Sequence, residues 1–530
     1  MSNKHTDDVE QPPFEEVECL VPPAPELLDK IIRSQQVFAS GKDLPATASA
    51  DVLDFRSFTV IKSRPPRTRA HTLVESNREF APVTGTRRAI VLLVDFSDKP
   101  ATQTLQHYKD LLFSSGTYAT GSMRDYYAEV SYGKLTVTGE VFGWFRAPKP
   151  KTYYTNGQNG FGTYPQNAQK LVEDVVTLAN PTVNFAPYDN DGNGVIEAIV
   201  IIAAGSGAEQ TGNPNDIWSH KWAITSMTVD GVKVQGYFMA PEDGKVGVMS
   251  HELGHLLLGQ PDLYDTDYSS RGTGSWDLMA GGSWNNNGNT PAHPVAYVKA
   301  KVGWSTVNTI FNASQTVTLL PYKTSDQIYK LPVGAADSKQ YFLLSNRRKL
   351  GFDAFIPGEG LLIEHIDENQ NNNTDENHYL VDVEQCDGKR DLNSNANSGD
   401  ATDVFPCSGT TGSFTVSTTP SSKAYDGSDS KVSVTEITKS GANVTAKVAV
   451  GTTSAAGPVW YNNVRILQTF ASSDTQNAWA SVEGIGWRKI KPNTPDSTTD
   501  IFIMCCEAQA SGLRMNVFAD ASVISIAFFV

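Results

Sequence analysis

The sequence predicts an α+β protein in which a region of mixed helices and strands is followed by regions rich in strands. In residues 85–308, buried apolar runs alternate with segments whose apolar residues recur at helical spacing. In residues 309–450, short alternating runs are separated by turn residues. The small-residue stretch GTTSAAGP, residues 451–458, indicates a linker before a last strand-rich unit, residues 459–530.

The length and charge of the chain limit what it can be. With 530 residues it is too long for one compact core, so several domains are expected. The chain carries 43 basic and 58 acidic residues, a net charge of −15, which argues against a nucleic-acid or anionic-membrane partner. We expect no membrane span, because no apolar run reaches the required length, and we expect a monomer.

The first 84 residues resemble an appended segment more than a folded core. They are rich in Pro, Glu and Arg, and one helix is expected at ELLDKIIRSQQVF. We therefore predict a pro-segment-like region at residues 1–84. Its start, MSNKHTDDVEQPPFEEVE, is polar and acidic and lacks the apolar stretch of a conventional signal peptide.

Ordered structure is expected to begin with a buried strand at RAIVLLVDFSD, and a second buried strand is expected at VIEAIVIIAAG. Ser122 is expected to cap the helix of GSMRDYYAEVSYG. The other predicted elements of this region are helices at YKDLLFSS, QNAQKLVEDVVTLAN and PVAYVKAKVGW, and a half-buried strand at KLTVTGEVFGWF.

Strands are predicted through the rest of the chain, among them QTVTLLPY, QYFLLSNRR, GLLIEHID, HYLVDVEQ, KVSVTEIT and the terminal VISIAFFV. Five cysteines are present, so at least one thiol is left over from any intramolecular pairing. Cys386 and Cys407 flank a polar loop and could form a disulfide or remain two buried thiols. Cys505 and Cys506 are expected on opposite faces of one strand.

The stretch VMSHELGHLLLGQPDLYD, residues 248–265, carries the H-E-x-x-H pattern of zinc proteases. On a helix, His251 and His255 share one face and can bind the same zinc ion. Glu252 lies beside that face, where it can take the proton of a zinc-activated water as general base. Gly259 can adopt a positive φ and end the helix, after which Asp262 is the first carboxylate that can serve as third ligand.

Further motifs accompany this helix in order, and Met279 lies in one of them. They are VLLVDFSDKP, GSMRDYYAEVSYGKLTVTG, YDNDGNGVIEAIVIIAAGSG, NDIWSHKW, WDLMAGGSW and TPAHPVAYVKAKVGW, with a weaker likeness in GFDAFIPGEGLLIEHID. On these stretches the chain resembles the immune inhibitor A family of metzincin-type zinc proteases. The resemblance implies a metzincin-like catalytic domain and a secreted endopeptidase that cleaves extracellular proteins. It also implies His251, His255 and Asp262 as zinc ligands, Glu252 as the base, and Met279 in an apolar floor beneath the metal.

The spacing after the second histidine departs from the family pattern. Three residues, Leu256 to Leu258, precede the glycine where two are more usual. The extra residue adds about 100° of helix or is absorbed in the last turn, so Asp265 stays an alternative third ligand. A thiolate is also a good zinc ligand. Cys19 could therefore bind the zinc as an inhibitor if residues 1–84 are a pro-segment, or it could be an ordinary surface or core thiol.

A possible calcium site precedes the second buried strand. Asp189, Asp191, Asn193, the carbonyl of Val195 and Glu197 occupy alternate positions, as in the first half of an EF-hand loop. The glutamate expected at the twelfth position is replaced by Val200, which excludes a complete EF-hand. The alternative is an Asx-rich turn without a metal. The resemblance favours a structural Ca²⁺.

Two other functions compete with the zinc endopeptidase. The first is a non-catalytic adhesion or binding protein that uses the protease-like region as a scaffold, although such a scaffold has no need of Glu252. The second is a peptidase specialised for glycoproteins, with a sugar-binding C-terminal unit that carries Trp460, Trp479 and Trp487. The group that stabilises the oxyanion is left open between Tyr264 and Tyr268.

Overall fold

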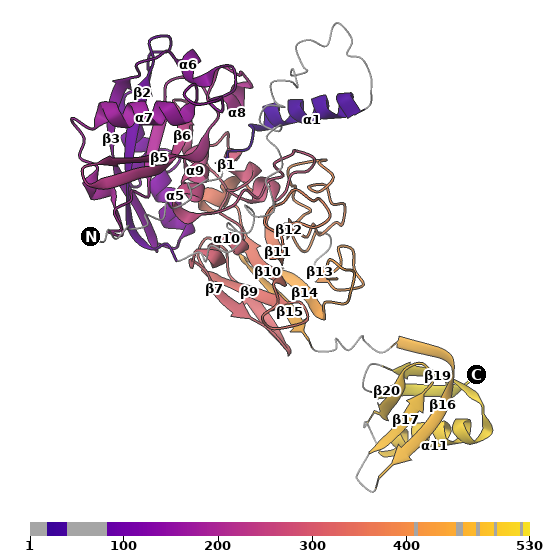
Figure 1. Ribbon diagram of the computed structural model, residues 1–530. Coiled ribbons are helices and arrows are strands. Elements are labelled where there is room, and N and C mark those ends of the chain that lie inside the picture. Colours follow the sequence, from indigo (N-terminus) through magenta and orange to yellow (C-terminus); the bar gives the residue numbers. More distant parts are fainter. Residues whose placement is uncertain are drawn as a thin grey trace, which may run out of the picture. The chain divides into compact units, whose positions relative to one another are not determined.

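The computed structural model describes residues 19–39, 82–407, 412–451, 459–472, 477–491, 495–519 and 523–530. Its contacts divide the chain into two compact units, Met1–Phe311 with Gln315–Val448 and Asn312–Ser314 with Ala449–Val530 (Figure 1). Most of the predicted pro-segment and of the predicted linker lies outside the described residues.

A six-stranded sheet is the centre of the first unit as far as it is described. Its order is β1 (Cys19–Leu20), β5 (His220–Val229), β6 (Val232–Pro241), β4 (Ile199–Ala203), β2 (Gly85–Asp95) and β3 (Leu135–Arg146). Strands β6, β4, β2 and β3 run parallel, whereas β5 and β1 are antiparallel to their neighbours. The two predicted buried strands are confirmed: β4 and the last seven residues of β2 are buried without alternation, as expected where both faces are covered.

The predicted helices of this region are confirmed as α4 (Leu105–Phe113), α5 (Met123–Val130), α7 (Ala168–Ala179), α9 (Val246–Leu258) and α10 (Ala296–Lys301). Helix α5 begins with a capping box, in which the Ser122 hydroxyl accepts from the backbone of Asp125 and the Asp125 carboxylate accepts from the backbone of Ser122, both at 3.1 Å. Shorter elements in the same region are α6 (Lys151–Thr155), α8 (Ala208–Thr211) and single 3-10 turns η1 (Ala186–Tyr188), η2 (Gly274–Trp276) and η3 (Gly281–Trp284). The N-terminal helix is confirmed as α1 (Pro25–Ala39).

Two further sheets complete the described part of this unit. One has the order β12 (Val381–Val383), β11 (Gly360–Asp367), β10 (Gln340–Arg347), β9 (Gln327–Pro332) and β7 (Thr306–Thr309). The other has the order β13 (Gly412–Phe414), β14 (Val432–Ser440), β15 (Asn443–Val450) and β8 (Ala313–Leu319). The Cys386–Cys407 disulfide is present and closes the polar loop between β12 and β13.

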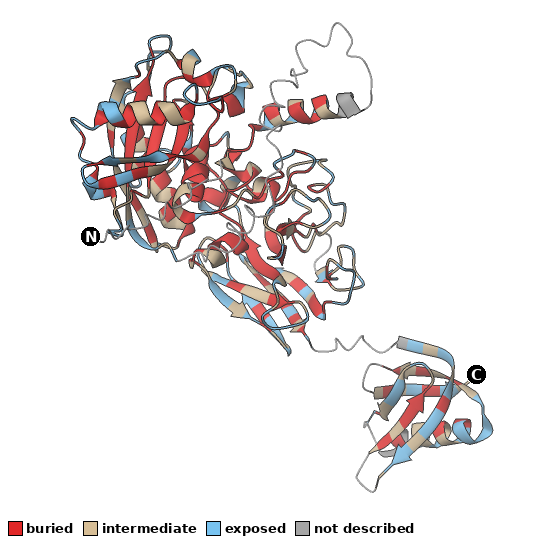
Figure 2. Ribbon diagram, in the orientation of Figure 1, coloured by how far each residue is buried: buried red, intermediate tan, exposed pale blue. Residues whose placement is uncertain are grey.

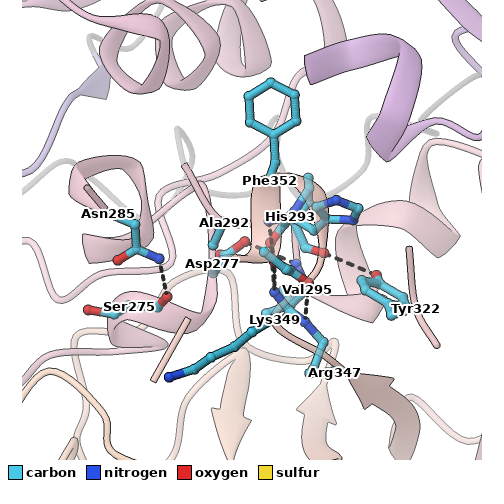
Figure 3. Close-up of polar contacts among 12 residues, drawn as sticks. Ser275, Asp277, Asn285, Ala292, His293, Val295, Tyr322, Arg347, Lys349 and Phe352 are labelled. Carbon is cyan, nitrogen blue, oxygen red and sulfur yellow. Dashed lines mark hydrogen bonds and ion pairs between the residues drawn. The ribbon is translucent and has the colours of Figure 1, made fainter. Parts of the chain in front are cut away.

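A buried polar network joins the protease-like region to these sheets (Figure 3). Arg347 of β10 is fully buried and forms two hydrogen bonds to Asp353, at 2.7 and 2.9 Å, in the 3-10 turn η4 (Gly351–Phe355). Tyr322 donates to the carbonyl of Pro294 at 3.0 Å, and Asp277 accepts from the backbone of Val295 at 3.0 Å. Buried charges are stable only when they are paired, so these contacts must be kept in the folded state. They hold the segment around Asp277 against the sheets.

The second unit is a closed barrel with the order β16 (Val459–Ala471), β17 (Ala478–Val482), β18 (Gly486–Ile490), β20 (Val523–Phe529) and β19 (Arg514–Ala519). In β19, buried residues alternate with partly buried ones, so one face of the strand lines the barrel core (Figure 2). The terminal strand is confirmed, but the strand predicted for Cys505 and Cys506 is wrong, because both lie in helix α11 (Pro495–Ser511). Cys505 and Ala508 are buried in the barrel core at helical spacing, a pattern that a short apolar run does not distinguish from a strand.

Among the described residues, no helix combines the length and the apolar character needed to cross a bilayer.

Candidate active site

Helix α9 carries the H-E-x-x-H residues into the interior of the first unit. His251 and Glu252 have no exposed surface and His255 is 3% exposed. The helix ends at Gly259, which adopts the predicted left-handed conformation with φ +63°. The chain then turns back and brings the Asp262 carboxylate to the two histidines.

Three donor atoms converge at this place. The Nε2 atoms of His251 and His255 are 3.0 Å apart, and Oδ1 of Asp262 lies 3.3 and 3.0 Å from them. Zinc bonds of about 2.0–2.2 Å in tetrahedral geometry place neighbouring donors roughly 3.3–3.5 Å apart. Two facing imidazole nitrogens and a carboxylate oxygen at this spacing are the donor set that fits a zinc ion.

Backbone carbonyls orient both imidazoles. Nδ1 of His251 lies 3.0 Å from the carbonyl oxygen of Leu278, and Nδ1 of His255 lies 2.6 Å from that of Gln260. A carbonyl only accepts, so each Nδ1 must carry the proton, and each Nε2 keeps its lone pair for a metal. Burial lowers the pKa of His255, although the charge of Asp262 acts in the opposite direction. The lowered pKa also favours the neutral ring that can bind a metal.

The segment that contains Met279 lies beneath the same helix. A Cβ atom added to Gly254 would lie 3.1 Å from the Met279 sulfur, so the thioether is in contact with the backbone of α9. The Leu263 amide donates to the Met279 carbonyl at 2.9 Å, which ties the turn after Asp262 to this segment. Met279 is fully buried.

Glu252 lies beside the donor atoms as a buried carboxylate. Neither of its oxygens has a hydrogen-bond partner of normal geometry among the described residues. Burial raises its pKa well above the usual value, as do the negative charges of Asp262 and Glu209. The backbone N–H of Val21 opposes this rise, although it donates its own hydrogen bond to Ser219 at 3.3 Å. An unpaired buried carboxylate is costly, which indicates a functional role.

The two acidic residues considered as third ligand have different surroundings. Burial alone would raise the pKa of Asp262, but its interactions with His255 and His251 outweigh burial and lower it. The carboxylate of Asp265 instead accepts hydrogen bonds from Asp267, Ser269 and Ser270 within its own turn. The extra leucine is accommodated within α9, which runs to Leu258 before Gly259 turns the chain.

The acidic loop before β4 brings together three of its five predicted ligands, the carboxylates. Single carboxylate oxygens of Asp189, Asp191 and Glu197 lie within 4.8 Å of one another. Asp189 accepts from the backbone of Asn193 at 3.2 Å, and the Asn193 side chain accepts from the backbone of Val195 at 2.8 Å. These are the contacts of an Asx-rich turn, and the clustered carboxylates form a candidate cation site.

The sequence left the place of Cys19 open and did not predict the short strand that begins there. Strand β1 is the edge strand of the sheet and pairs antiparallel with β5, with Leu20 opposite His220. The hydroxyl of Tyr264 donates to the carbonyl of Leu20 at 2.9 Å, and Tyr268 stacks on Tyr264 with ring centroids 6.3 Å apart. Of the two tyrosines considered as oxyanion partners, Tyr264 therefore contacts this segment directly and Tyr268 packs on Tyr264.

This arrangement is the one found in metalloprotease active sites: two histidines on one helix, a carboxylate after the following turn and a buried glutamate beside them. The comparisons agree. Residues 81–305 match the family model described as "Immune inhibitor A peptidase M6, catalytic domain", so the predicted family is confirmed for this stretch. This family implies a metal cofactor, typically zinc.

Two relatives match part of the chain. It is 35% identical over 256 residues to "Pre-pro-metalloprotease PrtV" of Vibrio cholerae serotype O1, covering 38% of this chain and 27% of that protein. It is 32% identical over 250 residues to "Immune inhibitor A" of Bacillus thuringiensis subsp. alesti, covering 37% of this chain and 36% of that protein. The chain thus matches about a quarter to a third of the length of these relatives.

Proposed function

We propose that this protein is a zinc-dependent endopeptidase with a metzincin-like catalytic domain, in which His251, His255 and Asp262 hold the zinc. The observation that carries the proposal is the convergence of these three donor atoms within 3.3 Å, with both Nδ1 atoms occupied by carbonyls. No purely structural role requires two imidazole lone pairs to face each other in a buried site.

Different residues of the chain would carry out different steps of peptide hydrolysis. When bound, the zinc polarises a peptide carbonyl and activates a water molecule. Glu252, buried and without a competing hydrogen bond, takes the proton of that water and later transfers it to the leaving amine. Tyr264, whose hydroxyl reaches a backbone carbonyl in the cleft, can donate to the carbonyl oxygen of the substrate.

The substrates we propose are extracellular proteins bound in extended form. Strand β5 can pair with an added antiparallel strand, as its pairing with β1 illustrates, and backbone pairing recognises a polypeptide of almost any sequence. The Cys386–Cys407 disulfide favours an oxidising compartment, which agrees with secretion. The name of the Vibrio relative describes a precursor, which supports a pro-segment at residues 1–84.

A metal chelator should abolish casein hydrolysis by this protein, and stoichiometric zinc should restore it. The expected loss is nearly complete, because the three donors cannot activate water on their own. Digestion is followed by release of soluble peptides, with metal content measured in parallel. Undiminished hydrolysis after the zinc has been removed would refute the proposal, and the absence of any hydrolysis by zinc-loaded, N-terminally processed protein would favour the adhesion alternative.

We further propose a structural calcium ion at Asp189, Asp191, Asn193, Val195 and Glu197. The melting temperature should rise by a few degrees in millimolar calcium, since an ion bound only by the folded state stabilises it by roughly 2–3 kcal/mol at a hundredfold excess over Kd. Asp191→Ala should remove most of the rise, whereas Asp243→Ala, an acidic residue outside this loop, should retain it. If the wild type has the same melting temperature in calcium and in a calcium-selective chelator, the loop binds no calcium and is an Asx-rich turn.

A further inference from the structure

We propose that a cavity beside the candidate metal site is a subsite for an acidic side chain of the substrate, and that the guanidinium of Arg271 binds the carboxylate of that side chain. This inference rests on the proposed endopeptidase function and deepens it by naming a class of substrate residue, Asp or Glu close to the cleaved bond. Three features of the cavity carry it: its position, a buried positive charge in its wall, and hydrogen-bonding capacity that the protein leaves unused.

The first feature is the position of the cavity. Tyr264, Tyr268 and Arg271 are among the residues that line it. The Tyr264 hydroxyl donates to the carbonyl of Leu20 at 2.9 Å, and the same carbonyl oxygen lies 3.3 Å from Nε2 of His251. The Tyr268 ring stacks on Tyr264. The cavity therefore begins one side chain away from the candidate metal ligands, within reach of a substrate residue near the cleaved bond.

The second feature is a positive charge that is buried in the cavity wall. Arg271 is only 9% exposed. Its backbone N–H donates to the carbonyl of Leu392 at 2.9 Å, and its own carbonyl accepts from the backbone of Gly274 at 3.0 Å, so the backbone of this residue is fixed. Burial of a guanidinium is costly unless an anion is paired with it. The wall thus presents a built site for a negatively charged group.

The third feature is unused hydrogen-bonding capacity. Nε of Arg271 has no hydrogen-bond partner among the described residues. Nη2 pairs with Asp29 of α1 at 3.0 Å, but the Asp29 side chain is 56% exposed, and an exposed ion pair contributes little stability. Arg347, by contrast, holds the buried Asp353 through both Nε and Nη2. A guanidinium has five N–H donors, so Arg271 can bind a further carboxylate at two points.

The other charged residue that lines the cavity is Asp265. Its carboxylate accepts hydrogen bonds within its own turn, from the backbone of Asp267, the hydroxyl of Ser269, and both the backbone and the hydroxyl of Ser270. These donors offset its negative charge and occupy its oxygens. The charge that is available to a ligand in the cavity is therefore the positive charge of Arg271.

The rest of the lining indicates the shape of the ligand. Pro22, Pro23 and Leu28 contribute apolar surface, and the rings of Tyr264 and Tyr268 contribute aromatic surface. An apolar lining with one guanidinium suits a short methylene chain that ends in a carboxylate. The side chains of Asp and Glu have this chemistry, whereas a Lys or Arg side chain would place a second positive charge beside Arg271.

The test uses the zinc-loaded protein and a peptide taken from a casein segment that it cleaves. Each residue near the cleaved bond is replaced in turn by Asp, Asn, Glu and Gln, and kcat/KM is measured for every peptide. At one position the acidic peptide should be preferred over its amide on the order of tenfold or more, because hydrogen bonds to a charged group are stronger than those between neutral groups. The ratio does not depend on the fraction of protein that is correctly folded.

Four variants separate substrate binding from a structural role of Arg271. Arg271→Gln should bring the ratio close to one, and Arg271→Lys should keep a weaker preference, because an ammonium retains the charge without the two-point geometry. Asp29→Asn removes the present partner of the guanidinium and should keep the preference. Arg124→Gln in α5, a partly exposed arginine that does not line the cavity, is the matched control and should give the wild-type ratio.

The outcomes distinguish this inference from the proposed function. Hydrolysis of the peptides without an acidic preference at any position would overturn the inference and leave the endopeptidase intact. An acidic preference that persists unchanged in Arg271→Gln would assign the preference to another residue and would also overturn the inference. No hydrolysis of casein or of any peptide by the zinc-loaded protein would contradict the proposed function and the inference together.

Discussion

Glu252→Gln should lower kcat by roughly 10³-fold, within the range of about 10²–10⁴ that a general base contributes, and should leave the zinc content unchanged. The glutamate oxygens are not among the three converging donor atoms, so an amide of the same shape removes proton transfer without removing a ligand. Turnover of casein and metal analysis after dialysis measure the two quantities separately.

The fold should tolerate this substitution. A carboxylate that is fully buried and without a regular hydrogen bond is costly to ionise, so a neutral amide should not lower the melting temperature. Glu252→Asp is the matched control: it keeps the carboxylate but withdraws it by one methylene, and its kcat should lie between those of the wild type and Glu252→Gln. Zinc loss in Glu252→Gln would show that Glu252 is a ligand, and near-normal kcat would show that another group is the base.

Asp262→Ala should lose zinc and activity together. The remaining donors are the two imidazoles. Loss of a direct ligand should weaken zinc binding on the order of 100-fold or more, which is a larger effect than that of removing a group that only orients a ligand. Both activity and metal content after dialysis should therefore fall to near background.

Asp265→Ala is the control that separates the two acidic residues. Its carboxylate holds the backbone and side chains of its own turn, so its removal should cost about 1–3 kcal/mol of stability, seen as a lower melting temperature, with the zinc retained. Loss of zinc from Asp265→Ala but not from Asp262→Ala would reverse the ligand assignment.

Several features followed from local sequence alone. The four-residue spacing of His251 and His255 places them on one helical face whatever the surroundings, and Gly259 ends that helix because it readily adopts a positive φ. The cap at Ser122 is equally local, since its hydrogen bonds span three residues. The fully apolar run of β4 indicated a strand covered on both faces.

Helix α11 shows where local reasoning failed. The run IFIMCC fits a strand as well as a buried helix, and only its packing against the barrel separates the two. The choice between Asp262 and Asp265 was open for a similar reason. One residue of helix changes direction by about 100°, so the register of the turn depends on what it packs against, here the segment that contains Met279.

The sequence by itself therefore indicated the helix with its two imidazoles, the adjacent glutamate and the family whose model residues 81–305 match. The tertiary structure alone decided which carboxylate meets the imidazoles, which carbonyls orient them, and that the Leu20 carbonyl lies beside His251 and Tyr264. Leu20 and Tyr264 are 244 residues apart, and no periodicity or spacing extends over that distance. Such contacts arise only when the whole unit packs, because the burial of α1 and the pairing of β1 with β5 together position the segment.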